Sequence, residues 1–294
     1  MTPRRIHGEI ADEVRGSSAP AGPAGAGIVL DHVDKHFFHN GTAVIALAEV
    51  SLSVAAGEFV SVIGPSGCGK STLLRIIGGL LAPDGGDVRI GDATPAEARA
   101  AKRFGFVPQT PALLPWRSVA GNVTLLRDVG RLPWRRHASS GPDDSGDAAS
   151  DPMALLAQVG LSGFARSLPR ELSGGMQQRV SLVRAFALGS PILLMDEPFA
   201  ALDEITRDAM RYQLLDIWGQ TQKTVVFVTH SIPEAVILSD RVVTMAARPG
   251  RVASVEQITL PRPRTEDMED SEEFAFHAHH VRSALRASWE GGEP

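Results

Sequence analysis

The sequence contains one cysteine and one tyrosine, and it has no excess of positive charge: 29 Lys and Arg stand against 34 Asp and Glu, so the formal net charge is −5. A single cysteine cannot form an internal disulfide, which excludes a disulfide-stapled secreted scaffold and favours a reducing, cytosolic setting. This charge gives the chain no net electrostatic attraction to nucleic acid or to an anionic membrane surface. No nucleic-acid partner is therefore expected.

Long apolar runs are also missing. A transmembrane helix needs about 20 consecutive apolar residues, whereas apolar stretches such as 192–195 and 225–228 have the length of a strand. The N-terminus carries Arg4 and Arg5, but Gly, Ala, Pro and Asp follow where a signal peptide would have its apolar segment. We therefore expect a chain that is neither secreted nor membrane-spanning, so that any connection to a membrane depends on a partner.

The order of the predicted elements indicates an α/β protein. Residues 1–26 are rich in small residues, Gly and Pro and predict a disordered leader. Short β-type runs then predict an antiparallel region, at 28–33, 42–47 and 50–54. From residue 59 onward strands alternate with helical stretches, which predicts a mostly parallel sheet with helices on its faces. These strands are expected at 59–63, 104–107, 192–195, 224–228 and 241–245.

Two helices are expected at 119–127 and 152–161, separated by a segment, 131–151, whose Ser, Gly and Asp content predicts a flexible insertion. A further helical pattern over 203–218 places four apolar side chains on one face, and we interpret this face as core. These side chains are Met210, Leu214, Ile217 and Trp218.

A glycine-rich motif follows the strand 59–63 and opens a helix. Its residues are Gly64, Pro65, Ser66, Gly67, Cys68, Gly69, Lys70 and Ser71, with Thr72 continuing the helix. This spacing, G-x-x-x-x-G-K-[ST] between a strand and a helix, is typical of the P-loop, whose backbone N–H groups bind phosphate oxygens. Lys70 is expected to reach the β- and γ-phosphates, and the Ser71 hydroxyl to ligate Mg²⁺. The motif alone indicates a nucleotide phosphate, and many NTPases share it.

Two carboxylates follow the apolar strand 192–195. Asp196 at the strand end is expected to hold Mg²⁺ through water, and Glu197 to orient the attacking water as a general base. Two acids after a buried strand could also form a solvated turn, but the P-loop gives them a specific role.

The segment Leu172–Arg179 reads Leu-Ser-Gly-Gly-Met-Gln-Gln-Arg, and it precedes Asp196 by about two dozen residues. Ser173, Gly174 and Gly175 at a helix start would form a second anion site. Leu-Ser-Gly-Gly followed by Gln resembles the signature sequence of ATP-binding cassette (ABC) ATPases. The order of the remaining motifs resembles the family as well: P-loop, Gln109, signature, the acidic pair, Asp203 and His230.

The resemblance implies a fold and a set of further roles. The fold is a P-loop NTPase core with an antiparallel β subdomain and an α-helical signature subdomain, within an ATPase domain at 27–260 whose helical part spans about 110–190. Gln109 corresponds to the glutamine that contacts Mg²⁺ and senses the transmembrane partner, and His230 to the histidine at the γ-phosphate. Phe37 corresponds to the aromatic that stacks on adenine; Phe38 is a neighbouring alternative, and either could instead lie in the core. Asp203 belongs to the family's D-loop.

Two further segments resemble the importers of nitrate, sulfonates, taurine and related anions: Leu113–Val119 and Arg248–Val252. Trp116 and Arg117 would lie where a permease docks, or Trp116 packs locally. The resemblance implies ATP and Mg²⁺ as ligands, a homodimer in which Ser173 of one chain completes the site at Lys70 of the other, two transmembrane permease subunits, an extracytoplasmic solute-binding protein as an indirect partner, and a peripheral place on the cytoplasmic face of the inner membrane.

Two other classes of function fit the sequence less well. A soluble ABC ATPase acting on DNA or ribosomes commonly has tandem cassettes, coiled-coil insertions or a basic surface, and none of these is present. A regulatory subunit without turnover would not need Lys70, Glu197 and His230 together. Residues 261–294 are expected as an acidic and helical tail, in which His277, His279 and His280 lie on a surface helix and bind no metal.

Overall fold

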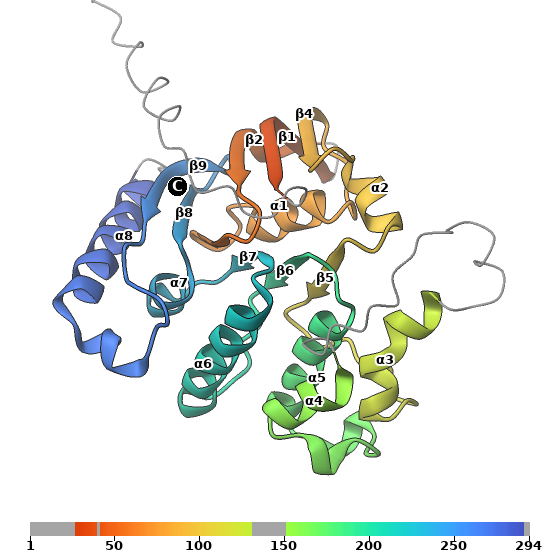
Figure 1. The fold of residues 1–294 in the computed structure, drawn as a ribbon. Coiled ribbons are helices and arrows are strands. Elements are labelled where there is room, and N and C mark those ends of the chain that lie inside the picture. Colours follow the sequence, from red (N-terminus) through yellow and green to blue (C-terminus); the bar gives the residue numbers. More distant parts are fainter. Residues whose placement is uncertain (1–26, 40–41, 131–150, 291–294) are drawn as a thin grey trace, which may run out of the picture.

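The computed structural model describes residues 27–39, 42–130 and 151–290 (Figure 1). The predicted leader, 1–26, and residues 131–150 of the predicted insertion lie outside the described part. Asp151, the last residue of that predicted insertion, is the N-cap of a helix and accepts hydrogen bonds from the backbone N–H groups of Met153 and Ala154. None of the helices in the described part is both long and apolar enough to cross a membrane.

The strands form two sheets. One is antiparallel, with the order β2-β1-β4; its strands are β1 (Ile28–His39), β2 (Thr42–Val54) and β4 (Gly85–Ile90). The other has the order β5-β6-β7-β3-β8-β9, parallel except for the antiparallel edge strand β9. Its strands are β3 (Phe59–Ile63), β5 (Phe104–Val107), β6 (Ile192–Asp196), β7 (Thr224–Val228), β8 (Arg241–Ala246) and β9 (Arg251–Gln257).

Eight α-helices occur in the described residues. They are α1 (Lys70–Ile77), α2 (Pro95–Ala100), α3 (Val119–Gly130), α4 (Pro152–Gln158), α5 (Gly174–Ala187), α6 (Glu204–Thr221), α7 (Ile232–Leu238) and α8 (Glu272–Glu290). Helices α3, α4 and α5 pack on one another, away from the antiparallel sheet (Figure 1). Helix α8 packs on α7, β8 and β9.

The six-stranded sheet separates two apolar cores, because successive side chains of a strand point to opposite faces. On β3, Val60 and Val62 face α1 and the antiparallel sheet, whereas Phe59 and Ile63 face the core of α5, α6 and α8. The strands β6 and β7 divide in the same way. These strands are buried on both faces, which explains why their sequences are continuous apolar runs.

Several sequence predictions are tested by this fold. The α/β class, the parallel sheet and the antiparallel region are confirmed, and the face of α6 that carries Met210, Leu214, Ile217 and Trp218 is buried. The prediction of two separate strands at 42–47 and 50–54 was wrong. Strand β2 is continuous, with an irregularity at Glu49, whose φ is 49°. The Asp34 carboxylate accepts the Glu49 N–H at 2.9 Å and stabilises this irregularity.

The C-terminal region is integrated into the fold. Phe274, Ala278 and Val281 of α8 are buried in the larger core, at the spacing that brings side chains onto one helix face. His277 is buried too, so its predicted place on a surface was wrong. Its ring contacts the Thr259 hydroxyl through Nε2 at 3.0 Å and the Glu256 carboxylate through Nδ1 at 3.2 Å.

Candidate active site

The P-loop connects β3 to α1, and its glycines are required by geometry. Gly67 and Gly69 have φ of 78° and 92°, a region that side chains disfavour. A Cβ at Gly64 would lie 2.6 Å from the Met245 carbonyl oxygen. Gly69 caps α1 without a side-chain hydrogen bond, and the helix has no acidic residue in its first turn. The backbone amides at this helix start are therefore suited to an anion.

Lys70, Ser71 and Thr72 form the first turn of α1. The Lys70 side chain is buried and folds back over the loop, where Nζ donates to the carbonyl oxygens of Gly64 at 2.8 Å and Pro65 at 3.0 Å. The Cys68 N–H donates to the Pro65 carbonyl, and burial raises the pKa of the Cys68 thiol. Burial thus favours the protonated thiol, and the Cys68 N–H stabilises the loop through its hydrogen bond to Pro65.

The Ser71 hydroxyl donates to Asp196 Oδ1 at 2.9 Å. Asp196 is the last residue of the buried strand β6, and burial raises the pKa of its carboxyl group, with the Ser71 hydrogen bond opposing that shift. A hydroxyl and a carboxylate this close are the oxygen ligands that Mg²⁺ prefers. The two residues therefore fit the predicted metal site.

The Glu197 carboxylate lies between the side chains of Gln109 and His230. Gln109 Nε2 donates to Glu197 Oε2 at 3.1 Å, and His230 Nδ1 lies 3.4 Å from the same oxygen. The side chain of Gln109, which the sequence predicted to contact Mg²⁺, therefore contacts Glu197 in this structure. Glu197 has φ of 45°, and its N–H donates to the Val228 carbonyl of the neighbouring strand.

These side chains converge because they follow parallel strands. Gln109 follows β5, and Asp196 ends β6 with Glu197 directly after it. His230 follows β7, and the P-loop follows β3. The carboxyl ends of parallel strands lie at one edge of a sheet, where α/β proteins bind ligands. We refer to this set, with Lys70 and Ser71, as the catalytic half-site.

A second group of predicted residues lies elsewhere in the chain. Ser173 is the N-cap of α5 and accepts from the Met176 N–H, and Asp203 is the N-cap of α6 and accepts from the Thr206 N–H. A Cβ on Gly175 would lie 3.2 Å from the Leu202 side chain, so the signature packs on the D-loop. In the described part of the chain no hydrogen bond or ion pair joins this signature half-site, Ser173–Gly175 with Asp203, to Lys70.

Phe37 and Phe38 both lie on β1 and are 41% and 80% exposed. Neither is a core residue, which removes that alternative for both. The Lys35 ammonium lies 5.7 Å from the centre of the Phe37 ring.

Sequence reasoning missed three polar residues that hold the loop after Gln109. Asn122 is fully buried and hydrogen-bonds to the backbone of Leu114 at both its oxygen and its nitrogen. Arg184 of α5 donates to the carbonyl oxygens of Pro111 and Ala112 at 2.9 and 2.8 Å, and burial lowers its pKa. Gln178 donates to Pro108 at 3.4 Å. The signal in the sequence that could have identified such residues is a polar residue within an apolar helical stretch.

The chain is similar over most of its length to ATP-binding subunits of transporters. The family model described as ABC transporter matches residues 47–200. The taurine import ATP-binding protein TauB of Jannaschia sp. is 42% identical over 231 residues, 77% of this chain and 80% of that protein. The aliphatic sulfonates import ATP-binding protein SsuB of Bacillus cereus is 38% identical over 251 residues, 84% and 92% of the two chains.

The fold agrees with that similarity. The ATP-binding cassette MJ0796, solved as a dimer in a post-hydrolysis state with ADP and Pi, superposes with a TM-score of 0.65 at 34% identity, covering 80% of this chain and all of that one. The chain therefore belongs to the ABC transporter family. It is an ABC ATPase with the P-loop NTPase fold, as the motifs predicted.

Proposed function

We propose that the catalytic half-site binds ATP with Mg²⁺ and positions water for attack on the γ-phosphate. The loop amides and the Lys70 ammonium would hold the phosphates, since Lys70 can exchange its two carbonyl partners for phosphate oxygens. Mg²⁺ held by Ser71 and Asp196 would neutralise phosphate charge. Phe37, or Phe38 beside it, would stack on adenine.

The observation that carries the proposal is the position of Glu197. Its Oε2 atom contacts Gln109 and His230, and His230 lines one groove with residues 64–66 of the P-loop; these contacts leave Oε1 for a water molecule. A carboxylate held in this way can orient the water and accept its proton as the bond to phosphorus forms. The exposed His230 is free to turn toward the γ-phosphate.

Glu197→Gln tests this role. The amide keeps the size of the side chain but cannot accept the proton, so we expect the turnover number to fall by ~10²–10⁴-fold while ATP binding is retained. The measurements are phosphate release by the purified chain and the affinity for a fluorescent ATP analogue. Glu266→Gln, on the exposed surface, is the matched control. Undiminished hydrolysis by the Glu197 variant would remove Glu197 from the mechanism.

We further propose that two copies complete each other's sites head to tail. The signature half-site carries an N-cap hydroxyl and the start of α5, which together can bind the γ-phosphate, yet it is not joined to Lys70 of its own chain. Two copies facing in opposite directions would place Ser173 of one chain against Lys70 of the other. ATP would then hold the dimer closed, and hydrolysis would release it.

We propose that this ATPase energises an importer of a small anion, such as nitrate, a sulfonate or taurine. Relatives named as taurine and aliphatic sulfonate import proteins support this class. Trp116 is 73% exposed and so does not pack locally; it suits an anchor for one of two permease subunits on the cytoplasmic face of the inner membrane. Co-purification of the permeases and the ligand of their extracytoplasmic solute-binding protein would test the class.

A further inference from the structure

A groove of about 620 Å³ lies beside the P-loop, and one of its walls comes from the end of the chain. Residues 64–66 and His230 form one side, and Arg282, Leu285, Arg286 and Trp289 of α8 form the other. We call it the C-terminal groove. None of the motifs that define the catalytic half-site includes its α8 wall, so the role of these four side chains is open.

The spacing of the groove residues on α8 places them on one side of the helix. Arg282, Arg286 and Trp289 are three and four residues apart, so they share a face of the helix. All three are exposed, and Trp289 is 66% exposed. Neither arginine has an ion pair within the described part of the chain. The wall therefore offers two unpaired cations and a large apolar ring beside the site of ATP.

The residues that follow the D-loop form a surface complementary to this wall, with one exposed apolar and one exposed acidic side chain. Ile205 is 84% exposed, and Glu204 beside it is exposed and has no ion pair among the described residues. Both follow Asp203 directly and so adjoin the signature half-site. In the proposed head-to-tail dimer this half-site would approach the P-loop of the other copy, whose residues 64–66 line the C-terminal groove together with His230.

We propose that the C-terminal groove is a docking site for the second copy of this chain, in which Ile205 of the second copy packs against Trp289 and Leu285, and Glu204 pairs with Arg286 or Arg282. This inference rests on the proposed dimer. It adds a contact between α8 and the start of α6 that lies outside the ATP-binding motifs. The dimer would thus be held by α8 as well as by nucleotide.

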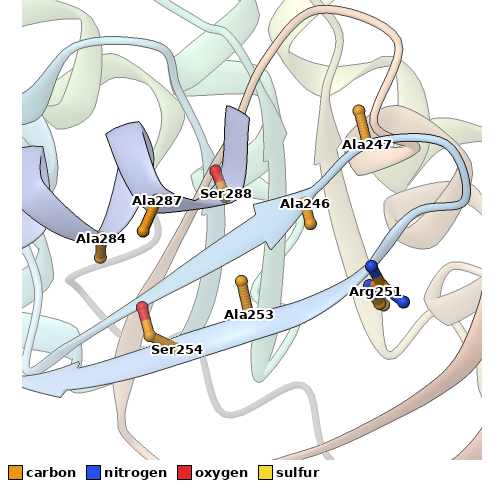
Figure 2. A pocket seen from close by; sticks show the side chains of 8 residues that line it. All are labelled: Ala246, Ala247, Arg251, Ala253, Ser254, Ala284, Ala287 and Ser288. Atoms are coloured by element: carbon orange, nitrogen blue, oxygen red, sulfur yellow. The ribbon is translucent and has the colours of Figure 1, made fainter. Parts of the chain in front are cut away.

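The packing behind α8 allows its end to adjust to a second copy. Between α8 and the hairpin of β8 and β9 lies a gap of about 270 Å³ lined mainly by small side chains. In Figure 2, Ala284 and Ala287 point from the helix toward the hairpin whose strand β9 carries Ala253 and Ser254. Because the side chains that line this gap are small, we expect the last turns of α8 to shift when a second copy binds, while Val281 stays in the core.

A cross-link in the Glu197→Gln background tests the contact. With Trp289→Cys and Ile205→Cys added and a mild oxidant present, we expect a covalent dimer that forms with ATP and Mg²⁺ and is reduced at least several-fold without them. Each single-cysteine variant, and Trp289→Cys paired with Phe164→Cys, are the controls. The native Cys68 is fully buried and does not compete.

Charge reversal provides a second measurement. In the same background we expect Arg286→Glu to raise the dimer dissociation constant with ATP by roughly tenfold, and Glu204→Arg added to it to restore much of the loss. Ser283→Glu, which adds a charge to α8 outside the groove, should have little effect. Sedimentation of the purified chains gives these constants.

The outcomes separate the two proposals. If the Glu197→Gln parent does not dimerise with ATP, the proposed dimer is wrong and the docking site falls with it. If the parent dimerises but the cysteine pair fails to cross-link and Arg286→Glu dimerises like the parent, the docking site alone is overturned. Cross-linking that depends on ATP together with rescue by the double charge swap supports it.

Discussion

Three carboxylates near the predicted site differ in what surrounds them. Asp196 and Glu234 are buried, and burial raises the pKa of each, whereas Glu197 keeps hydrogen-bonding partners at the edge of solvent. Glu234 accepts a hydrogen bond from Thr229 at 2.5 Å and lies 3.8 Å from Arg207. Thr229 directly precedes His230, so Glu234 supports the segment that carries this histidine, and burial imposes a cost on the charge of Glu234 as it does on that of Asp196.

This cost predicts a pH dependence of stability. Because the pKa of Glu234 is higher in the folded protein than in the unfolded chain, its contribution is most favourable at low pH and is lost as pH rises from about 4.5 through the folded pKa. Glu234→Gln removes this dependence and still accepts the Thr229 hydrogen bond. We expect the Tm of the variant, relative to the parent, to rise by roughly 2–4 °C across that window.

Thermal unfolding followed by circular dichroism from pH 4 to pH 8 measures the difference. Glu266→Gln, at an exposed site, should show no such trend. A Tm difference for Glu234→Gln that stays constant over the whole range would contradict the assignment of burial as the dominant cause.

At the scale of elements, the sequence predicted motifs better than contacts. The P-loop and the acidic pair are continuous in sequence and directly follow apolar strands, so their positions at one sheet edge followed from the strand pattern. The continuous strand β2 was missed because the irregularity at Glu49 depends on Asp34, a distant residue. Burial of His277 was missed for the same reason, since its partners Thr259 and Glu256 lie on other elements.

The loop after Gln109 carries an element-scale prediction. Asn122 and Arg184 hold its backbone, so Trp116 at its tip is exposed without contributing to the core. We expect Trp116→Ala to leave the Tm and the ATPase rate of the free chain unchanged and to abolish co-purification with the permeases. Phe164→Ala, another exposed aromatic, is the control. An equal yield of permease with both variants would show that Trp116 is not the anchor.

The turn between β8 and β9 carries a second prediction at the scale of elements. A Cβ at Gly250 would lie 2.3 Å from the Cys68 carbonyl oxygen and 2.5 Å from that of Ala46, so the turn is wedged between the P-loop and β2. We expect Gly250→Ala to push the loop, weaken ATP binding and destabilise the fold by ~1–3 kcal/mol. Gly219→Ala, where a Cβ meets nothing within 4 Å, is the control. Nucleotide titration and urea unfolding measure the two effects, and parental affinity in Gly250→Ala would contradict the prediction.

At the scale of the whole molecule, one chain contains two half-sites on separate elements. The sequence predicted both from motif order, and the packing of Gly175 on Leu202 now joins the signature to the D-loop as one surface. The relation between the two half-sites depends on a second copy, so it could not be predicted from strand pattern or burial. Only the family resemblance supplied it.

Mixing inactive chains tests this relation. Lys70→Ala and Ser173→Arg should each abolish hydrolysis alone, since each homodimer has two damaged sites. Random pairing gives heterodimers with one intact site, so we expect the mixture to recover about a quarter of the parental rate. A mixture that stays inactive, while size-exclusion shows that heterodimers form, would place both residues in the same site of one chain.

Ser173 caps the start of helix α5, and Arg184 near the other end of the helix donates hydrogen bonds to the backbone of the loop that carries Trp116. Eleven residues of α-helix separate the two, a rigid rod of about 16 Å. In the proposed dimer a displacement of the loop would therefore move the far end of this helix, where Ser173 would face the nucleotide of the other copy. Each permease would in this way govern hydrolysis chiefly at the ATP held by the opposite chain, so that the two transport half-cycles are crossed rather than parallel.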